Sequence, residues 1–127
     1  ALIVRKPLES WSKGRVTLLG DACHSTLPFL SQGANMSFED GVVLARCLET
    51  SPDNVDVAFR LYEKARKERT TGIVELSAKQ LTRVHNPKLK ERSGGLEHID
   101  REYEPGRVDT RYRWIYGYDA ATVDLIK

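Results

Sequence analysis

The sequence has few cysteines, no long apolar run and almost no net charge, and each shortage excludes a class of protein. Cys23 and Cys47 are too far apart for a Cys-x-x-Cys site and have no surrounding histidine cluster, so we predict two structural thiols and no metal site. The absence of a membrane-length apolar segment and of a signal-peptide layout predicts a cytoplasmic protein. A net charge of +2 provides no strong field for nucleic acid.

The 127 residues suffice for one domain, and 40% hydrophobic residues can form a modest core. The chain has no initiator methionine and opens on an apolar run, Ala1 to Val4, that is typical of a strand. We therefore expect a piece of a longer protein.

Apolar periodicity predicts two main helices and one or two short strands. Val16 to Leu19 is broken only by Thr17, which is typical of a strand buried on both faces. A loop over 20–31 should separate it from a first helix that runs from Gln32 or Gly33 to about Glu49. The apolar stripe predicted for that helix consists of Ala34, Phe38, Val42, Ala45 and Leu48.

The second predicted helix is long, from Val55 to Val84, and either Asp53 or Asn54 can cap its first turn. Pro87 should stop it. Residues 86–113 contain Gly-Gly and Pro-Gly breakers and alternate charges without an apolar period, so we expect a loop-rich segment or short helical pieces. The aromatic tail after it should pack back onto the body.

The segment between the strand and the first helix carries the chemistry. Gly20 has no Cβ and lets a ligand pass close to the strand end, and Asp21 places a carboxylate where it suits vicinal hydroxyls. Pro28 fixes a rigid turn. At the start of the helix, Gly33, Ala34 and Asn35 present unpaired amides that attract negative charge together with the helix dipole.

The order Gly-Asp-Ala-x-His, Pro, Gln-Gly-x-Asn and Glu-Asp over residues 20–40 resembles the second flavin-binding motif of the FAD-dependent aromatic hydroxylases. Residues 7–15 and 62–70 also resemble this family. The closing Trp-x-Tyr-Gly-Tyr-Asp of residues 114–119 is similar to the salicylate and 6-hydroxynicotinate hydroxylase branch. Within the family, Ser25 departs from the proline that this branch often has after the histidine, which could loosen the loop.

The resemblance implies roles for the motif residues. Asp21 would bind the ribityl chain of FAD, and Pro28 would lie near the reactive edge of the flavin. The amides of Gly33, Ala34 and Asn35 would hold the pyrimidine end of the ring, with Gly20 and Gln32 completing the motif. No side chain of the segment need act as an acid or a base, and no catalytic residue is predicted firmly.

By the same resemblance, the parent fold is an α/β, Rossmann-like FAD-binding domain, and this chain is a mostly helical piece of it. The parent would hydroxylate an aromatic ring, such as a hydroxybenzoate, with NADH or NADPH and O2. The family's Gly-x-Gly-x-x-Gly turn is absent, so residues 1–127 are expected to be the C-terminal portion of the domain. Alone, the chain should be inactive, should bind FAD weakly if at all, and could form a homo-oligomer.

Two other classes of function stay open. The chain could be a helical interaction module that retains the motif as a relic, or part of a related flavoprotein that does not hydroxylate.

Several charged and aromatic residues also allow two interpretations each. His24 could be catalytic, but a loop histidine held by local hydrogen bonds is favoured. Glu39 and Asp40 could be paired acid/base carboxylates, but first-turn charges that complement the helix dipole are favoured. The basic run 64–69 is predicted to be a solvated face. The tail aromatics Trp114, Tyr116 and Tyr118 could stack on a ring ligand, but packing in the core or at an interface is favoured.

Overall fold

The computed structural model describes residues 5–125, and the strand expected at residues 1–4 lies outside them. Most of the described residues are helical, which confirms the expectation of a mostly α piece. In chain order, the elements are β1 (Ser12–Lys13), β2 (Val16–Thr17), α1 (Asp21–His24), η1 (Pro28–Leu30), α2 (Gly33–Thr50), α3 (Val55–Val84), η2 (Pro87–Lys90), α4 (Arg92–Glu102) and α5 (Pro105–Tyr116).

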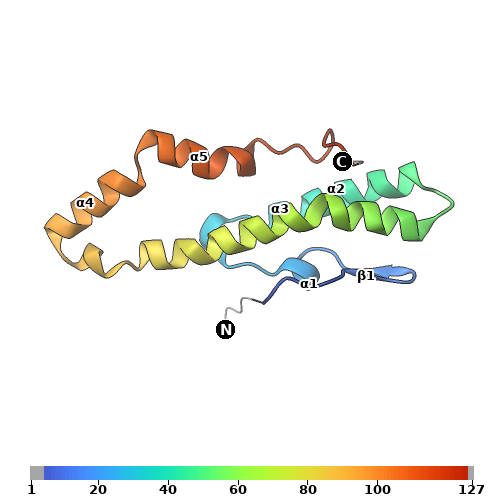
Figure 1. Ribbon diagram of the computed structural model, residues 1–127, viewed down its shortest axis with the longest axis horizontal. Helices are drawn as coiled ribbons and strands as arrows, with labels where there is room; N and C mark the ends of the chain where they lie inside the picture. The colour runs from blue at the N-terminus through green and yellow to red at the C-terminus, as the bar shows by residue number, and fades with distance from the viewer. Residues whose placement is uncertain (1–4, 126–127) are drawn as a thin grey trace.

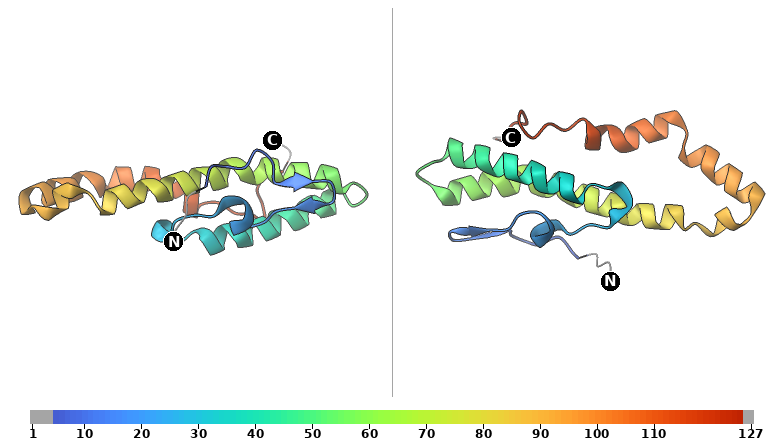
Figure 2. Two further views of the ribbon diagram at one scale, coloured as in Figure 1. Left: turned by 90° about the horizontal axis from the view of Figure 1, so that it is seen from below. Right: turned by 180° about the vertical axis from the view of Figure 1, so that it is seen from behind.

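A hairpin of the two long helices, α2 and α3, forms the centre of the molecule (Figure 1). The N-terminal segment with the β hairpin and α1 lies on one side of this pair. On the other side, α4 and α5 turn the chain back, so that the C-terminal tail runs along α2 and α3 (Figures 1 and 2). None of the helices over residues 5–125 is long and apolar enough to cross a membrane.

The bounds of the two long helices agree with the sequence prediction. The α3 helix spans the predicted range, and α2 ends one residue later than expected. Of the two candidate caps, Asn54 is the one used: its side chain accepts a hydrogen bond from the Val57 amide at 3.1 Å. Within α3, Lys67 Nζ lies 3.3 Å from Oε1 of Glu63, which precedes it by one helical turn.

Two apolar clusters hold the elements together. Around the helix hairpin, one cluster contains Trp11, Cys23, Val43, Cys47, Ala58, Tyr62 and Leu125. The second joins η1 and the start of α2 to α3 and α5, and it contains Leu30, Met36, Ile73, Val74 and Ile115. Each cluster includes one residue from the last 13 of the chain, so the aromatic tail packs back onto the body as predicted.

The apolar stripe predicted for α2 lies on its exposed face, which corrects the sequence prediction. Phe38 is 74% exposed and Val42 is 42% exposed. The face that packs on α3 instead consists of Met36, Asp40, Val43 and Cys47. Because α2 is apolar on both faces, periodicity alone could not select the face that meets α3. A helix of this kind is typical of the interior of a larger domain.

The prediction of a strand buried on both faces is also wrong for the described residues. Val16 is 67% exposed, and β2 pairs only with β1, antiparallel, with Ser12 opposite Thr17. A two-residue ladder with one partner cannot cover both faces of its side chains. Gly14 makes the tight connection between the two strands in a left-handed conformation, with φ of +57°.

One segment predicted as a loop contains helices, and a second, predicted as either loop-rich or short helical pieces, is helical. Residues 20–31 include α1 and η1, and residues 86–113 form η2, α4 and most of α5, so the loop-rich interpretation is replaced by the helical one. The presumed breakers have other uses. Pro105 occupies the first turn of α5, where a missing amide hydrogen costs nothing. Gly94 lets α4 approach η2, since a Cβ there would lie 3.3 Å from the Lys88 carbonyl oxygen.

Candidate functional site

The N-terminus of α2 is an exposed, uncapped helix end. No side chain of residues 5–125 caps it, and its first turn contains no acidic residue. Ala34 and Asn35 are exposed and Gly33 is half-buried. The first hydrogen bond into the helix runs from the Met36 amide to the Gln32 carbonyl, at 2.8 Å. The amides of Gly33, Ala34 and Asn35 come before this first helical hydrogen bond, and they suit an electron-rich ligand.

The residues before α2 form a turn that sets the direction in which the backbone enters this helix. Pro28 begins η1, and Ser31 ends it in a left-handed conformation with φ of 53°. The side chain of Gln32 is buried and donates a hydrogen bond to the Leu30 carbonyl at 3.3 Å. Gln32 thus shapes the turn with its side chain. Pro28 is exposed on the same segment.

Asp21 lies next to the start of α2, as the motif requires. It is exposed, and its Oδ1 is 4.0 Å from the point where a side chain on Gly33 would begin. Residues 12 apart in sequence are therefore brought together by the turn through α1 and η1. The carboxylate and the helix amides form one accessible surface, with an acceptor for hydroxyl groups beside a set of donors.

Gly20 is required for packing. Its φ is +63°, and a Cβ would lie 2.6 Å from Ser37 Oγ. The lack of a side chain lets the turn approach the second turn of α2. The sequence interpretation had instead explained the missing side chain by the approach of a ligand. Contact between Gly20 and a ligand stays a prediction.

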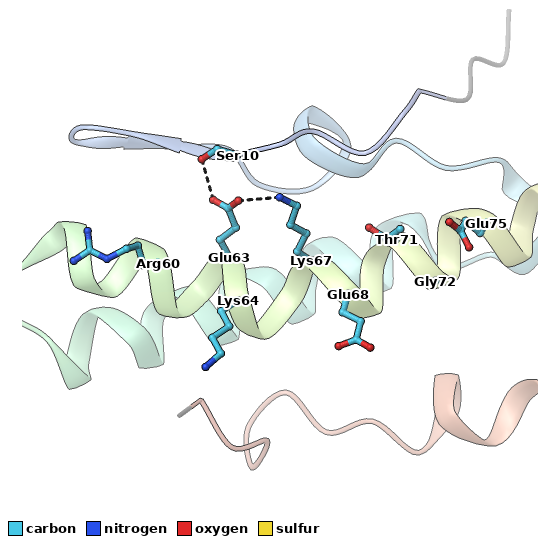
Figure 3. A pocket seen from close by; sticks show the side chains of 9 residues that line it. All are labelled: Ser10, Arg60, Glu63, Lys64, Lys67, Glu68, Thr71, Gly72 and Glu75. Atoms are coloured by element: carbon cyan, nitrogen blue, oxygen red, sulfur yellow. Dashed lines mark hydrogen bonds and ion pairs between the residues drawn. The ribbon is translucent and has the colours of Figure 1, made fainter. Parts of the chain in front are cut away.

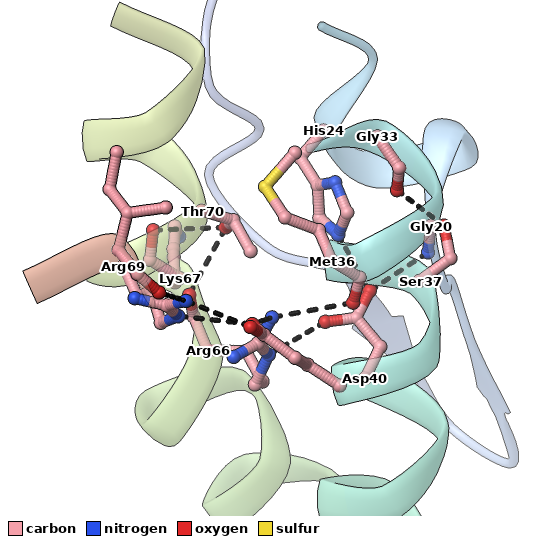
Figure 4. Close-up of polar contacts among 12 residues, drawn as sticks. Gly20, His24, Gly33, Met36, Ser37, Asp40, Arg66, Lys67, Arg69 and Thr70 are labelled. Atoms are coloured by element: carbon pink, nitrogen blue, oxygen red, sulfur yellow. Dashed lines mark hydrogen bonds and ion pairs between the residues drawn. The ribbon is translucent and has the colours of Figure 1, made fainter. Parts of the chain in front are cut away.

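A buried polar network lies beneath this surface (Figure 4). Asp40, which is fully buried, accepts hydrogen bonds from the Gly20 amide at 3.0 Å, from His24 Nε2 at 2.6 Å and from Arg66 Nε at 2.7 Å. Arg66, also fully buried, donates through Nη2 to the Met36 carbonyl at 3.3 Å and to Glu39 at 2.7 Å. The network joins α1, α2 and α3.

The charges of the network stabilise one another. Burial alone would raise the pKa of Asp40, but the hydrogen bonds and positive charge of its partners hold that pKa below its usual value. For Arg66, burial opposes the charge, yet the hydrogen bond to Asp40 raises its pKa. The carboxylate is therefore ionised at neutral pH, as part of a compensated buried pair.

A second part of the network attaches the C-terminal tail. Arg69 forms a bidentate pair with Glu39, at 2.8 and 3.0 Å, and donates to the carbonyls of Trp114 and Ile115, both at 2.9 Å. Its guanidinium lies 3.9 Å from the ring centroid of Tyr118. Tyr118 thus stacks on an arginine, whereas Trp114 is 42% exposed and Tyr116 is 68% exposed.

These contacts correct two interpretations of the sequence. Glu39 and Asp40 lie beyond the first turn of α2 and pair with arginines, so they do not serve as first-turn charges. The run 64–69 is not wholly solvated, because Arg66 is fully buried. One signal could have revealed this: Asp40 sits three or four residues from Met36 and Val43, and a charge inside an apolar stripe needs a partner. His24 is held by a hydrogen bond, as the favoured interpretation expected. However, it lies in α1 instead of a loop, and its partner Asp40 is 16 residues away in the sequence.

Cys23, His24 and Asp40 bring potential metal ligands within 4.8 Å of one another. Burial raises the pKa of the Cys23 thiol to about 12, so it remains protonated, and its Sγ lies 3.3 Å from the Gly20 carbonyl oxygen. Asp40 is already paired with Arg66. A cation here would meet an arginine and an un-ionised thiol, and both oppose metal binding.

A more voluminous hollow lies elsewhere, along the outer face of α3 (Figure 3). It has a volume of about 880 Å³ and is open and lined mainly by charged side chains of both signs, including Arg60, Lys64 and Glu68. None of the motif residues lines it. We do not consider this groove the site, because mixed charges at helical spacing are typical of a solvated face. The hollow beside Asp21 is only about 40 Å³, and an open hollow of about 300 Å³ lies beside Gln32 and Asn35.

Comparison with known proteins gives a consistent family. Residues 4–77 match the family described as FAD binding domain. The chain is 50% identical over 128 aligned residues to a 6-hydroxynicotinate 3-monooxygenase of Pseudomonas fluorescens, covering 100% of this chain and 27% of that protein. It is 38% identical over 120 residues to a 3-hydroxybenzoate 6-hydroxylase of Polaromonas naphthalenivorans (strain CJ2), covering 91% and 28%.

A solved structure agrees with these relatives. The crystal structure of FqzB superposes with a TM-score of 0.71 at 35% identity, over 95% of this chain and 27% of that one. The chain therefore spans little more than a quarter of the length of the proteins it matches.

Proposed function

Because the chain belongs to the FAD binding domain family, we propose that its exposed surface at Asp21 and the start of α2 is one part of the flavin site of an aromatic-ring monooxygenase. FAD is the cofactor of this family. The observation that carries the proposal is the uncapped N-terminus of α2 beside an accessible carboxylate.

The residues present fit a flavin on physical grounds. A flavin combines a polyhydroxyl chain with a ring whose pyrimidine end carries electron-rich oxygen and nitrogen atoms. The carboxylate of Asp21 would accept hydrogen bonds from the ribityl hydroxyls. The amides at Gly33, Ala34 and Asn35 would donate to the pyrimidine end, where the helix dipole favours negative charge. Pro28 would border the ring without placing a donor against it.

These residues bind and orient. Bound FAD supplies the electron transfer and oxygen activation that hydroxylation requires. The helix end offers fixed dipoles that need no reorganisation when negative charge develops on the ring. His24 is buried and engaged with Asp40, which favours a structural role for it. NADH or NADPH as reductant, O2 as oxidant and a hydroxylated or amino-substituted aromatic acid as substrate belong to the same proposal, since the relatives are named for such substrates.

The flavin part is tested by titrating FAD with the chain and following flavin fluorescence and visible absorbance. We expect weak binding, at micromolar or higher Kd, because the open surface contacts only part of the cofactor. Asp21→Asn should weaken this binding and Asp53→Asn, at the exposed turn between α2 and α3, should not. No spectral change at high micromolar concentrations of protein would favour an interaction module over a flavin site.

The activity is tested in a chimaera. This chain would replace the aligned 128 residues of the Pseudomonas fluorescens relative, and FAD content, NAD(P)H oxidation and hydroxylated product would be measured with 6-hydroxynicotinate. Retained FAD with coupled product formation supports the proposal. Retained FAD with NAD(P)H oxidation but no oxygen insertion would favour a related flavoprotein that does not hydroxylate.

A further inference from the structure

We propose that Asp40 is a positioning residue for the flavin surface: it sets the Gly20–Asp21 turn against the amide end of α2 without touching the ligand. The inference rests on the proposed function and deepens it. Asp40 is fully buried, so it cannot itself contact a ligand on the outer surface.

The contacts of Asp40 connect the two halves of the surface. One carboxylate oxygen, Oδ2, accepts from the Gly20 amide at 3.0 Å and from His24 Nε2 at 2.6 Å. Gly20 directly precedes Asp21, and His24 is the last residue of α1. A single oxygen thus holds both ends of the short helix that begins with Asp21.

The other oxygen connects to the helix end that carries the amides. Oδ1 accepts from Arg66 Nε at 2.7 Å, and Arg66 Nη2 donates to the Met36 carbonyl at 3.3 Å. Met36 directly follows Gly33, Ala34 and Asn35, the residues whose amides begin α2. Arg66 comes from α3, so its hydrogen bonds fix the position of the first turn of α2 relative to the long helix α3.

The local backbone explains why such a tether is needed. The α1 helix has only four residues and no side-chain cap, and so short a helix is not stable by itself. Gly20 lies in a left-handed conformation. Glycine has many other backbone conformations available to it, so holding it in this one costs conformational entropy. Without Asp40, Gly20 would lose its acceptor and His24 its partner, and the Asp21 carboxylate would sample positions away from Gly33.

A further observation separates Asp40 from an ordinary core residue. Replacing a buried ion pair by apolar groups often preserves stability, so burial alone does not require a carboxylate here. Its two oxygens accept from three donors, which come from α1 with its N-cap Gly20 and from α3. An amide cannot reproduce this, because its NH2 group would face the donor of either Gly20 or Arg66.

The test compares three variants of the 127-residue chain. Asp40→Asn keeps the shape, removes the charge and replaces one of the two acceptor oxygens by a donor. Cys47→Ala lies on the same face of α2, at the opposite end from the surface, and lowers stability by opening a cavity. Glu102→Gln is a charge-matched control, because Glu102 Oε2 accepts from Arg83 at 2.8 Å and Arg111 at 3.1 Å.

Two quantities are measured beside the free energy of unfolding. Amide hydrogen exchange by NMR reports the local turn: in Asp40→Asn, exchange at Gly20, Cys23 and His24 should accelerate at least tenfold relative to Ile73 in the middle of α3. FAD titration reports the surface: the Kd should rise about tenfold in Asp40→Asn, and stay within about twofold in the two controls.

The outcomes separate the inference from the proposed function. Equal losses of FAD affinity in Asp40→Asn and Cys47→Ala at matched stability would overturn the positioning role. If the unmodified chain binds no FAD, the proposed function fails for the chain, and the exchange data decide the inference. Acceleration confined to residues 20–24 supports it, and uniform or absent acceleration refutes it.

Discussion

Replacing Gly20 by alanine is the sharpest test of how the turn is built. A residue with a side chain at φ of +63° and ψ of −138° is strained, at a cost of about 1–3 kcal/mol. The new Cβ would also lie 2.6 Å from Ser37 Oγ. To make room, Ser37 must rotate and give up its 3.1 Å hydrogen bond to the Gly33 carbonyl, which adds about 1 kcal/mol.

The expected loss of stability is therefore about 2–4 kcal/mol, a large part of the roughly 5–15 kcal/mol that a domain usually has. Urea denaturation followed by circular dichroism measures it. Gly14→Ala is the matched control, because Gly14 also has a positive φ, of +57°, but nothing within 4 Å of the added Cβ. It should lose only the backbone part, about 1–2 kcal/mol.

A further variant separates the two contributions at Gly20. In the Ser37→Gly background the hydroxyl and its Cβ are gone, so Gly20→Ala should cost only the backbone strain, as at Gly14. The reasoning is refuted if Gly20→Ala costs no more than Gly14→Ala, or if the Ser37→Gly background does not reduce the difference. Either result would mean that the turn is not packed tightly on α2.

Three other measurements test the electrostatics, the capping and the exposed face. The folded pKa of Asp40 is below its unfolded value, so its stabilisation is complete above an unfolded pKa of about 3.9 and is lost as pH falls through the lower folded pKa. Acid titration of unfolding should thus show a smaller loss of stability below pH of about 4 in Asp40→Asn, and identical pH profiles would contradict the assignment. Asn54→Ala should cost about 1 kcal/mol by loss of the cap, and Asp53→Ala almost nothing; equal costs in urea denaturation would refute the choice of cap. The apolar face of α2 should drive self-association at high concentrations, and Phe38→Ser should reduce it in sedimentation velocity, whereas Leu96→Ser on α4 should not; an unchanged distribution in Phe38→Ser would exclude this face.

The sequence predicted best where the information is local. The long helices have strong breakers at their ends, so their bounds could be inferred to within one residue. The motif residues between strand and helix could likewise be named, because the order of glycine, carboxylate, proline and helix start is itself sequential. The structure adds that Asp21 and Gly33 lie next to each other, which follows from the path of α1 and η1 rather than from spacing.

Long-range pairing could not be read from the sequence. Asp40 and Arg66 are 26 residues apart, and nothing in either helix alone identifies the other as its partner. The face of α2 was inferred wrongly for a related reason. Two apolar faces satisfy the same periodicity, and only the packing of α3 decides which one is buried.

The sequence by itself therefore determined the two long helices and their ends and named the residues that we propose for the flavin surface, since propensity, capping and turn chemistry act over a few residues. The tertiary structure alone decided which charges are buried, which face of α2 stays exposed and how the Gly20–Asp21 turn is held. Those outcomes depend on contacts between residues far apart in the chain, where burial turns a weak charge pair into a geometric constraint.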